Sequence, residues 1–377
     1  VGFIIASNSN WLGEFNYFKS LIGSINDLNE ETRIELYLFT SRNEKFFTKK
    51  NFTRINIVKT NFLNPNGVLH YIKRISSYFF GKYDPILIFL LKRYSINILS
   101  HYKPLFGFKN ISWLPDFQHI HYPNFFSRKE LSYRDKLYNN YIKNSDLLVV
   151  SSKSSKKDLI KFGSLKKKIN ILNFVPRMNF SIIKNKNFLN KEIDIKKRYI
   201  FTPNQFWIHK NHICIIEALK ILKNKGLNIQ CILTGSKIDH RKPNHFKNLM
   251  KKIKKYNLIK EIKYRGILPY EKIINLLYHA EVIINPSYFE GWSTVVEEAK
   301  ILDKKILLSN IEVHHEQNPK NGLYFNPDNP KELANSIINS FKGKKKMKDI
   351  NKLIKIYEHK KTLFAKKYID IVMRLYN

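Results

Sequence analysis

Short apolar runs alternate with amphipathic stretches along most of the chain. In the first half, the runs that suit buried strands cover residues 2–7, 34–39, 111–115, 146–151 and 169–174. Stretches with apolar residues at helical spacing separate them. This alternation predicts repeated strand–helix–strand units built around a parallel sheet.

The alternation restarts after residue 198 and is more regular there. The expected strands are 199–203, 228–235, 261–266, 281–286 and 305–310, and the expected helices are 211–225, 244–256, 270–280 and 294–302. This favours a second doubly wound α/β domain.

Residues 178–198 are polar and charged without a clean period, which favours an interdomain linker. The chain has 377 residues, and at about 150 residues per domain it should hold two domains. We therefore expect Rossmann-like domains at 1–180 and 199–360, a linker at 181–198, and a terminal helix at 361–377 that packs back on the body.

Composition supports a folded chain, since 43% of its residues are hydrophobic and 14% are aromatic. Cys214 and Cys231 stand in apolar surroundings without metal or redox spacing, so both are predicted to be buried. The most apolar run, 85–99, is too short for a membrane span and contains Lys92 and Arg93. With no visible signal peptide, we expect a cytoplasmic protein.

The net charge of +37 comes from 67 Lys and Arg residues against 30 Asp and Glu residues. Such an excess favours an anionic partner, either nucleic acid, an anionic membrane surface or a phosphorylated substrate. The chain is also crowded with Lys, Asn, Ile, Phe and Tyr, so a biased genome composition explains the excess equally well. A membrane contact would be expected at the basic stretches 247–256 and 341–355.

The stretch NPSYFEGWSTVVEEAK, residues 285–300, places three carboxylates around one glycine turn of this basic chain. Gly291 permits a tight turn after a buried strand, and Ser293 or Thr294 suits the N-cap of the helix that follows. Backbone N–H groups at such a helix start can bind a phosphate.

The carboxylates of Glu290 and Glu298 could accept hydrogen bonds from ligand hydroxyls beside that phosphate. Hydroxyls next to a diphosphate are what a nucleotide sugar offers. The alternative is that Glu297 and Glu298 only favour the positive end of the helix dipole and that Glu290 is solvated.

The loop TPNQFWIHKNH, residues 202–212, follows the first strand of the second half. Lys210 on this loop should lie at the same sheet edge as Glu290, where its ammonium group could neutralise a pyrophosphate. The alternative is an ordinary surface lysine. His209 and His212 lack a third metal ligand nearby, and the chain has no Asp-x-Asp pair, so we expect no metal and no other cofactor.

Two turns of the first half are further candidates. Gly13, in NSNWLGEFNYF, would let a ligand approach the backbone at a helix start. The stretch WLPDFQHIHYPNFFS carries Asp116, Gln118, His119 and His121 among aromatic residues. This composition suits a polar ligand or proton transfer, and a loop packed by its own aromatic residues is the alternative.

The stretch FEGWSTVVEEA resembles the Glu-x7-Glu signature of the retaining glycosyltransferases of family four, whose GT-B fold has two Rossmann-like domains facing an interdomain cleft. Further similarity follows the order of that family along the chain, in WLGEFNYF, WLPDFQH, SDLLVVSS, NQFWIHKNH, LTGS, YRGILPYEKI and LLSNIEVHHEQ. The resemblance implies metal-independent transfer of a sugar from a nucleotide sugar to a saccharide, free or lipid-linked, in polysaccharide or lipopolysaccharide biosynthesis.

The resemblance also implies residue roles. Glu290 would contact donor-sugar hydroxyls, Glu298 the ribose diol and Lys210 the diphosphate. The implied catalytic residues are His119, Glu290 and Lys210, and those on the acceptor side, in the N-terminal domain, are Asp116, Gln118 and His121. The implied donor site consists of Gly13, Gln205, Lys210, Gly266, Leu268, Glu290, Gly291, Trp292, Ser293, Thr294, Val295 and Glu298.

The chain departs from the family pattern at two places. Gln205 stands where many relatives have an arginine, and Gly13-Glu14 stands where many have a Gly-Gly pair. Both changes fall on phosphate contacts, so one such contact is weakened or reassigned.

Two other functions stay open. A GT-B sugar-nucleotide epimerase would use the same donor pocket without an acceptor. A basic nucleic-acid-binding α/β protein would explain the charge but not the carboxylate turn. The transferase interpretation involves a nucleotide-sugar donor and a saccharide acceptor and no nucleic acid, with an anionic membrane surface as a further expected partner on the inner face of the cytoplasmic membrane.

Overall fold

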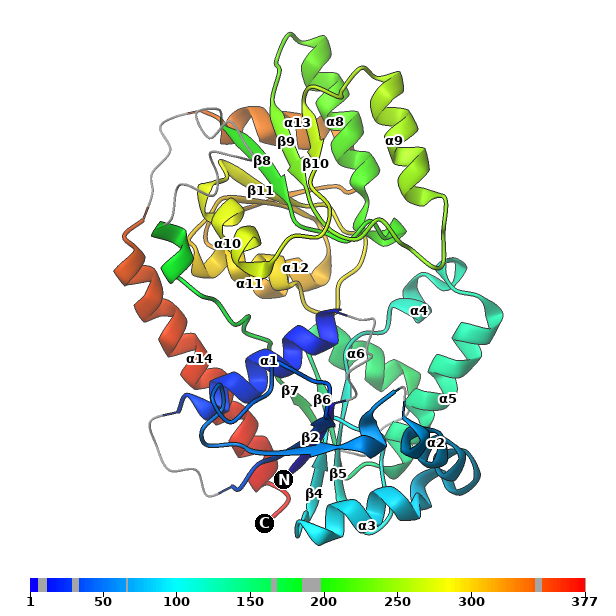
Figure 1. Cartoon of the computed structure of the whole chain (residues 1–377). Coiled ribbons are helices and arrows are strands. Elements are labelled where there is room, and N and C mark those ends of the chain that lie inside the picture. The colour runs from blue at the N-terminus through cyan, green and yellow to red at the C-terminus, as the bar shows by residue number, and fades with distance from the viewer. Residues whose placement is uncertain are drawn as a thin grey trace. The chain divides into compact units, whose positions relative to one another are not determined.

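The structure is a computed structural model that describes residues 1–5, 12–28, 34–65, 67–163, 168–184, 198–342 and 348–376. The chain forms two compact units (Figure 1). Unit 1 holds Val1–Phe117, Arg128–Arg177 and His359–Asn377, and unit 2 holds Gln118–Ser127 and Met178–Glu358. Most of the predicted linker, 181–198, falls outside the described residues.

In unit 1 the described residues form a seven-stranded sheet in the order β3-β2-β1-β4-β5-β6-β7, and all paired strands are parallel. The strands are β1 (Gly2–Ile5), β2 (Tyr37–Ser41), β3 (Asn56–Thr60), β4 (Ile98–Ser100), β5 (Lys109–Leu114), β6 (Leu147–Val150) and β7 (Ile169–Ile171). The helices are α1 (Leu12–Asn26), η1 (Asn61–Leu63), α2 (Val68–Phe80), η2 (Gly81–Tyr83), α3 (Pro85–Arg93), α5 (Arg128–Asn144) and α6 (Lys153–Phe162).

Unit 2 has a six-stranded parallel sheet within its described residues, in the order β10-β9-β8-β11-β12-β13. The strands are β8 (Tyr199–Thr202), β9 (Gln230–Leu233), β10 (Ile262–Tyr264), β11 (Val282–Asn285), β12 (Ile306–Ser309) and β13 (Gly322–Phe325). The helices are α4 (Gln118–His121), η3 (Pro123–Phe125), η4 (Ser181–Lys184), η5 (Ile208–Lys210), α8 (His212–Asn224), α9 (His245–Lys255), α10 (Tyr270–His279), α11 (Thr294–Ile301), α12 (Glu312–Gln317) and α13 (Pro330–Ser340).

The two sheets share one topology. In each, the second and third strands lie on one side of the first strand, and the later strands lie on its other side. The order reverses between β1 and β4 in unit 1 and between β8 and β11 in unit 2. In a doubly wound sheet the loops beyond the carboxyl ends of the strands at this point hold the ligand. These two points are therefore the places at which a site is expected.

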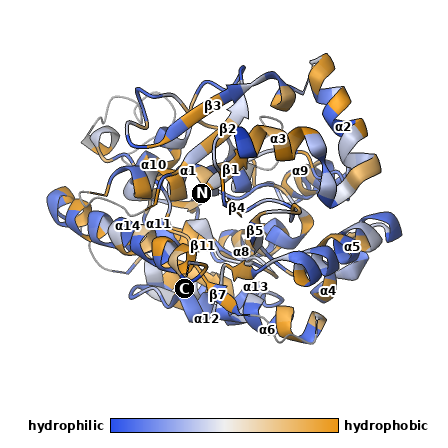
Figure 2. Ribbon diagram, turned by 90° about the horizontal axis from the view of Figure 1, so that it is seen from below, coloured by the Kyte–Doolittle hydropathy of each residue, from blue (hydrophilic) through white to orange (hydrophobic). Residues whose placement is uncertain are grey.

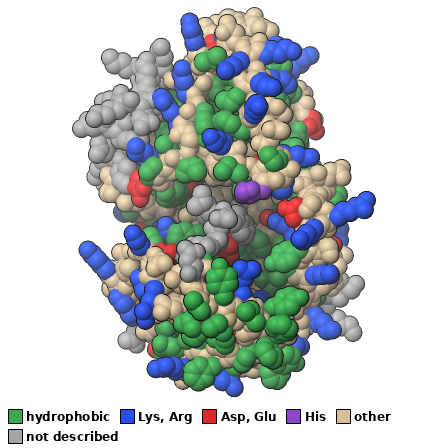
Figure 3. Space-filling view, turned by 45° about the vertical axis from the view of Figure 1, so that its right-hand side comes forward, with side chains coloured by type: hydrophobic (Ala, Val, Ile, Leu, Met, Phe, Trp, Pro, Cys, Tyr) green, Lys and Arg blue, Asp and Glu red, His purple; other side chains and the backbone are tan. Residues whose placement is uncertain are grey.

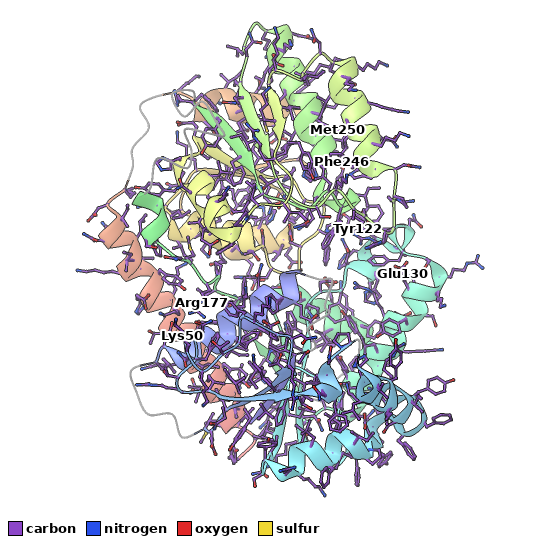
Figure 4. All side chains as sticks on the ribbon, viewed as in Figure 1. Lys50, Tyr122, Glu130, Arg177, Phe246 and Met250 are labelled. Carbon is purple, nitrogen blue, oxygen red and sulfur yellow. The ribbon has the colours of Figure 1, made fainter. Side chains whose placement is uncertain are left out.

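The core of unit 2 explains why its central strands are mostly apolar. Every residue of β8, β11 and β12 is buried, because helices cover both faces of the sheet. Cys214 and Cys231 both lie in one apolar cluster of this core, as the sequence predicts. Phe246 and Met250 pack against the same cluster from α9, where Figure 4 labels them.

The predicted parallel α/β architecture is confirmed, and the predicted strands of the second half all occur with slightly shorter bounds. Three strands lacked a clear signal: β4 has only three residues, while β3 and β13 are partly exposed and interrupted by polar residues or glycine. Short or half-covered strands give weak apolar runs, so periodicity alone does not identify them.

The C-terminal stretch forms one helix, α14 (Ile350–Met373), along which hydrophobic and hydrophilic residues alternate (Figure 2). Residues up to Glu358 belong to unit 2 and those from His359 belong to unit 1. In unit 1 the Tyr368 hydroxyl donates to Ser100 Oγ at 2.9 Å. Of the helices that the structure describes, none has both the length and the apolar character needed to cross a membrane.

Candidate functional site

Two loops of unit 2 meet beyond the carboxyl ends of β8 and β11, which is where the strand order reverses. The first loop carries Lys210 and the second carries Glu290. The Tyr288 N–H donates to His209 O at 2.8 Å, and Asn211 Nδ2 donates to Pro286 O at 3.2 Å. Backbone contacts therefore fix the two loops to each other.

Lys210 and Glu290 form an ion pair, with 2.7 Å between Nζ and Oε1. Their side chains are only 13% and 9% exposed, so Glu290 is not solvated and Lys210 is not an ordinary surface lysine. The same Glu290 oxygen accepts from Ser287 Oγ at 2.7 Å and lies 3.4 Å from Asn285 Nδ2. Burial alone would raise the pKa of Glu290, but Lys210 and these hydrogen bonds lower it, so the carboxylate is charged.

Asn285, the last residue of β11, organises the turn that follows. It is fully buried, and its Oδ1 accepts from Asn204 at 3.2 Å and from Ser287 at 2.6 Å. Its Nδ2 donates to Ser293 Oγ at 2.7 Å. Sequence analysis did not select Asn285, although a polar residue that ends a buried apolar strand is a usable signal, because such a group needs a partner.

The predicted helix start is at Ser293. Its side chain accepts a hydrogen bond from the Val296 N–H at 3.4 Å and so caps α11. Gln317 of α12 accepts from the Ser293 N–H at 3.2 Å and donates to the Ser293 carbonyl at 2.9 Å. These two hydrogen bonds fix the N-terminus of α11 to α12. The free backbone N–H groups at such a terminus favour an anionic group.

Glu297 has a structural role. Its Oε1 accepts from Lys300 at 2.9 Å and from Gln317 Nε2 at 3.0 Å, and its side chain is 5% exposed. The carboxylate thus ties α11 to α12. For Glu297, the alternative that this carboxylate only stabilises the start of the helix is therefore sufficient, and no contact with a ligand is needed.

Glu298 is buried in a different environment. The Tyr270 hydroxyl, at the start of α10, donates to Glu298 Oε1 at 2.6 Å. Burial raises the pKa of Glu298 to about 7, although the hydrogen bond from Tyr270 favours the charged form. The three carboxylates of the turn therefore have three distinct environments, and Glu298 is the one whose charge changes near neutral pH.

Stability should therefore depend on pH through Glu298. Its pKa is about 7 in the folded chain against an ordinary value of 4.5, so between these values the folded chain binds more protons than the unfolded chain. The free energy of unfolding should fall as pH rises through this window, by about 3 kcal/mol in total, and level off above it. Urea unfolding of the parent and of Glu298→Gln at about pH 5 and about pH 8 measures this component. An equal pH slope in the variant would contradict the assignment.

The loops after β9 and β10 complete this edge of the sheet. Gly235 has a φ of +128°, and a Cβ there would lie 2.4 Å from the carbonyl oxygen of Asn204, so only glycine fits. Its N–H donates to Gly266 O at 2.8 Å. Gln205 Oε1 accepts from the Ser236 N–H at 2.6 Å, so the residue that replaces the expected arginine holds a neighbouring loop.

The other predicted donor residues lie on the same loops of unit 2. Leu268 is half-buried and precedes α10, and Gly291 and Trp292 lie between β11 and α11. Thr294 and Val295 form the first turn of α11.

Gln118, His119 and His121 form α4, and contacts group this helix with unit 2. Gln118 Oε1 accepts from Arg241 Nη1 at 3.1 Å. The Arg241 side chain also pairs with Asp239 at 3.1 Å and stands 3.4 Å from His209 Nδ1, next to Lys210 in the chain. Sequence analysis missed Arg241, since one arginine in a basic loop gives no signal.

The segment around α4 also touches the loop of Glu290. The ring of His121 lies 5.2 Å from the ring of Phe289, and the Tyr122 hydroxyl donates to Tyr288 O at 3.2 Å (Figure 4 labels Tyr122). His119 is buried. The structure thus brings His121 and Tyr122 close to the Glu290 loop within unit 2.

Asp116 and Gly13 belong to unit 1. The Asp116 carboxylate lies 3.3 Å from Arg134 Nη1, and its backbone carbonyl accepts from the Tyr138 hydroxyl at 2.7 Å. Gly13 lies in the first turn of α1. Asp116 is therefore engaged with α5 of unit 1.

His314 of α12 is a further residue that sequence analysis missed. It is fully buried, and burial lowers its pKa to about 4, so the ring is neutral near the charged Glu290. His212 is also neutral and stacks on Phe206 at 4.2 Å. Across the part of the chain that the structure describes, no cluster of three His, Cys, Asp or Glu residues has metal-site geometry.

The fold is GT-B, with two parallel-sheet α/β domains, as solved relatives show. Sucrose-phosphate synthase from Thermosynechococcus elongatus has a TM-score of 0.73 and 14% identity, and the match covers 100% of this chain and 98% of that one. Anabaena Alr3699/HepE, solved in complex with UDP and glucose, has a TM-score of 0.70 and 14% identity, with 99% and 98% of the two chains covered. A glycosyltransferase from Rickettsia africae has a TM-score of 0.65 and 17% identity, with 100% and 97% covered.

Residues 183–355 match the family Glycosyl transferases group 1. This region carries Lys210, Glu290 and Glu298. No curated protein matches the sequence. The family match and the solved neighbours together support a glycosyltransferase.

Proposed function

We propose that the protein is a retaining, metal-independent glycosyltransferase that moves a sugar from a nucleotide-sugar donor to a saccharide acceptor. The observation that carries this proposal is the Lys210–Glu290 pair at the β8/β11 reversal point, within 2.7 Å. A cation, a helix N-terminus and two buried carboxylates on one sheet edge suit a ligand with a diphosphate and several hydroxyls.

In the proposed complex, the diphosphate binds at the N-terminus of α11 and at Lys210. Glu290 accepts hydrogen bonds from hydroxyls of the donor sugar, and Glu298 accepts them from the ribose diol. Glu290 is suited to this role because its carboxylate is charged and held by three donors. Loops that are fixed before the ligand arrives lose little entropy on binding.

The proposed chemistry is front-face transfer. The bond between the anomeric carbon and the diphosphate oxygen breaks, and the acceptor oxygen bonds to that carbon from the same side. The acceptor's proton passes to the leaving diphosphate, whose developing charge Lys210 and the helix N-terminus stabilise. This route retains the anomeric configuration without a carboxylate nucleophile, and Glu290 Oε1 is already occupied by Lys210, Ser287 and Asn285.

We further propose that the acceptor is a lipid-linked saccharide of a polysaccharide or lipopolysaccharide pathway, and that the enzyme works at the inner face of the cytoplasmic membrane. The charge of +37 supports an anionic surface as a partner. The resemblance of the sequence to transferases of such pathways supports the acceptor class.

Nucleotide binding tests this proposal. In buffer with EDTA, one of UDP, GDP and ADP is expected to raise the melting temperature of the parent by several degrees. Glu298→Ala should lose this shift, because it removes the acceptor for the ribose diol. Affinity should also weaken as pH falls below about 7, since a protonated Glu298 accepts hydrogen bonds less well. UDP is the first probe, because the HepE neighbour was solved with it.

The control is Glu312→Ala, an exposed carboxylate on α12, which should keep the full shift. A shift that needs added Mg²⁺ would overturn metal independence. If no nucleotide stabilises the parent, both the transferase and the epimerase interpretations fail. Salt-sensitive binding to duplex DNA would then favour a nucleic-acid-binding protein. Isomerisation of the donor without any acceptor would favour the epimerase.

A further inference from the structure

Helix α2 of unit 1 turns its polar side inward. The Ser76 hydroxyl donates to Asp84 Oδ1 at 3.0 Å, and the Ser77 hydroxyl donates to Asp84 Oδ2. Lys73 Nζ lies 3.4 Å from the Tyr102 hydroxyl, and His70 Nδ1 lies within 3.4 Å of a carbonyl of η1. Asp84 is fully buried. Hydrogen bonds rather than apolar contacts therefore attach this helix to the body.

The opposite side of α2 is apolar and exposed. Its large hydrophobic residues are between 38% and 85% exposed, and they are Val68, Leu69, Tyr71, Ile72, Ile75, Tyr78, Phe79 and Phe80. A surface helix normally buries its apolar side. Here Tyr71, Ile75, Tyr78 and Phe79 line a cavity of unit 1, and the other apolar residues of α2 lie on open surface, where an apolar patch marks an interaction site.

The exposed apolar surface continues beyond α2. Tyr83 of η2, Phe89 of α3 and Phe106 of the loop before β5 are also exposed, and the rings of Tyr83 and Phe106 lie 4.9 Å apart. Figure 3 shows hydrophobic side chains gathered over this part of unit 1, with Lys and Arg around them. We call this surface, formed by α2, η2, α3 and Phe106, the α2 face.

The segment that forms the α2 face has an excess of positive charge. Between residues 61 and 115 the only acidic residue is Asp84, and it is buried beneath α2. The same segment carries the cations Lys73, Arg74, Lys82, Lys92, Arg93, Lys103 and Lys109. An apolar centre with a cationic border is complementary to an anionic bilayer, because hydrocarbon accepts the apolar side chains and lipid phosphates attract the cations.

A second copy of the chain is a poorer partner for the α2 face. In a two-fold dimer the same patch meets itself, so the cationic border of one copy would face that of the other. Like charges across an interface oppose association. The charge pattern thus favours anionic lipid over self-association.

The α2 face borders a cavity of about 970 Å³ in unit 1. Its walls include Ile5 at the end of β1, His101 after β4, and Tyr71 and Lys73 of α2, so it lies at the β1/β4 reversal point. Glu14 also lines it, and burial raises the pKa of that carboxyl. A membrane against the α2 face would therefore meet the ligand-binding edge of the unit 1 sheet.

We propose that the α2 face docks on an anionic lipid bilayer, with the apolar residues of α2 and α3 inserted among the lipids and the cations at the headgroups. Given the proposed function, this contact would deliver a lipid-linked acceptor to the unit 1 cavity. It assigns membrane binding to α2 and α3 instead of the basic stretches 247–256 and 341–355; the first forms α9, and the second lies partly outside the described residues.

Vesicle sedimentation of the full chain tests the docking. The parent should partition about tenfold or more better onto vesicles of phosphatidylglycerol and phosphatidylcholine in equal parts than onto phosphatidylcholine alone. Val68→Ser/Ile72→Ser/Phe89→Ser changes exposed residues that do not line the cavity, and it should lower partitioning on the order of tenfold or more. The matched control, Ile160→Ser/Leu227→Ser/Ile259→Ser, removes exposed apolar residues elsewhere and should bind like the parent.

Charge exchange separates the two basic regions. Lys82→Gln/Lys92→Gln/Arg93→Gln should weaken partitioning onto the anionic vesicles severalfold, while Lys251→Gln/Lys254→Gln/Lys255→Gln on α9 should not. Equal effects of the two triple variants, or full binding by the apolar triple variant, would overturn the proposal.

Sedimentation velocity without lipid that shows a dimer for the parent and a monomer for the apolar variant would identify a second copy as the occupant. A nucleotide-induced thermal shift that persists in every variant would show that loss of vesicle binding leaves the donor site, and the proposed function, intact.

Discussion

Replacing Glu290 by glutamine is expected to lower kcat/KM for sugar transfer on the order of 10³-fold, or about 4 kcal/mol in transition-state stabilisation. Glutamine keeps the size of the side chain but removes the charge that pairs with Lys210 at 2.7 Å. Its amide group also brings a donor into a site that already contains the donors of Ser287 and Asn285. Release of nucleoside diphosphate from the sugar donor measures the rate.

The affinity of Glu290→Gln for the nucleotide alone should not fall with its turnover. Without the carboxylate of Glu290, the diphosphate becomes the main counter-ion of Lys210, so the Kd for the nucleotide alone should stay within about threefold or tighten. Glu312→Gln is the control and should keep the parental rate. Parental turnover in Glu290→Gln, or equal losses of turnover and of nucleotide affinity, would contradict a role at the donor sugar.

Replacing Lys210 by methionine is expected to destabilise the fold by about 3–5 kcal/mol, because it leaves the Glu290 carboxylate buried without its cation. The double variant Lys210→Met/Glu290→Met removes both charges and should recover most of this loss, since an apolar pair of similar volume avoids the desolvation of ions. Urea unfolding of the parent, Lys210→Met, Glu290→Met and the double variant gives the coupling free energy. Neither Lys210 variant should show the nucleotide-induced thermal shift.

The control for this cycle is the Lys252–Glu217 pair, whose two side chains are 36% and 25% exposed. Lys252→Met should cost no more than about 1 kcal/mol, because water screens an exposed pair. If Lys210→Met costs no more than Lys252→Met, the Lys210–Glu290 pair is not desolvated in solution. The physical basis assigned to the pKa of Glu290 would then be wrong.

The two carboxylates of the Glu-x7-Glu turn lie in different electrostatic environments. Glu290 is held charged by Lys210, whereas Glu298 has only the hydroxyl of Tyr270 and a pKa of about 7. A donor that binds with its ribose at Glu298 would favour the charged form and release a proton. In the proposed complex, donor binding would thereby be linked to pH through one residue.

The amino-acid sequence determined the class of fold and most of the strands, although β3, β4 and β13 gave no clear signal. Strands such as β8, β11 and β12 are apolar except for their last residue and buried throughout, which is stable only in a parallel sheet with both faces covered. It also located the functional turns, since Gly291 and Ser293 mark a strand-to-helix connection by local backbone chemistry. Because parallel strands end at one edge, the sequence placed Lys210 and Glu290 on the same side.

Only the tertiary structure decided what each side chain contacts. Lys210 and Glu290 are 80 positions apart in the chain, and Tyr270 and Glu298 are 28 apart, so their pairing depends on how the loops pack. The partners of Glu297 distinguish it from Glu298, although the two are adjacent. The sequence of α2 places apolar and polar residues on opposite sides of the helix, but it does not tell which side is buried. The carboxylate of the buried Asp84 accepts hydrogen bonds from two serines of α2, and only the folded chain shows that this polar side of the helix faces inward.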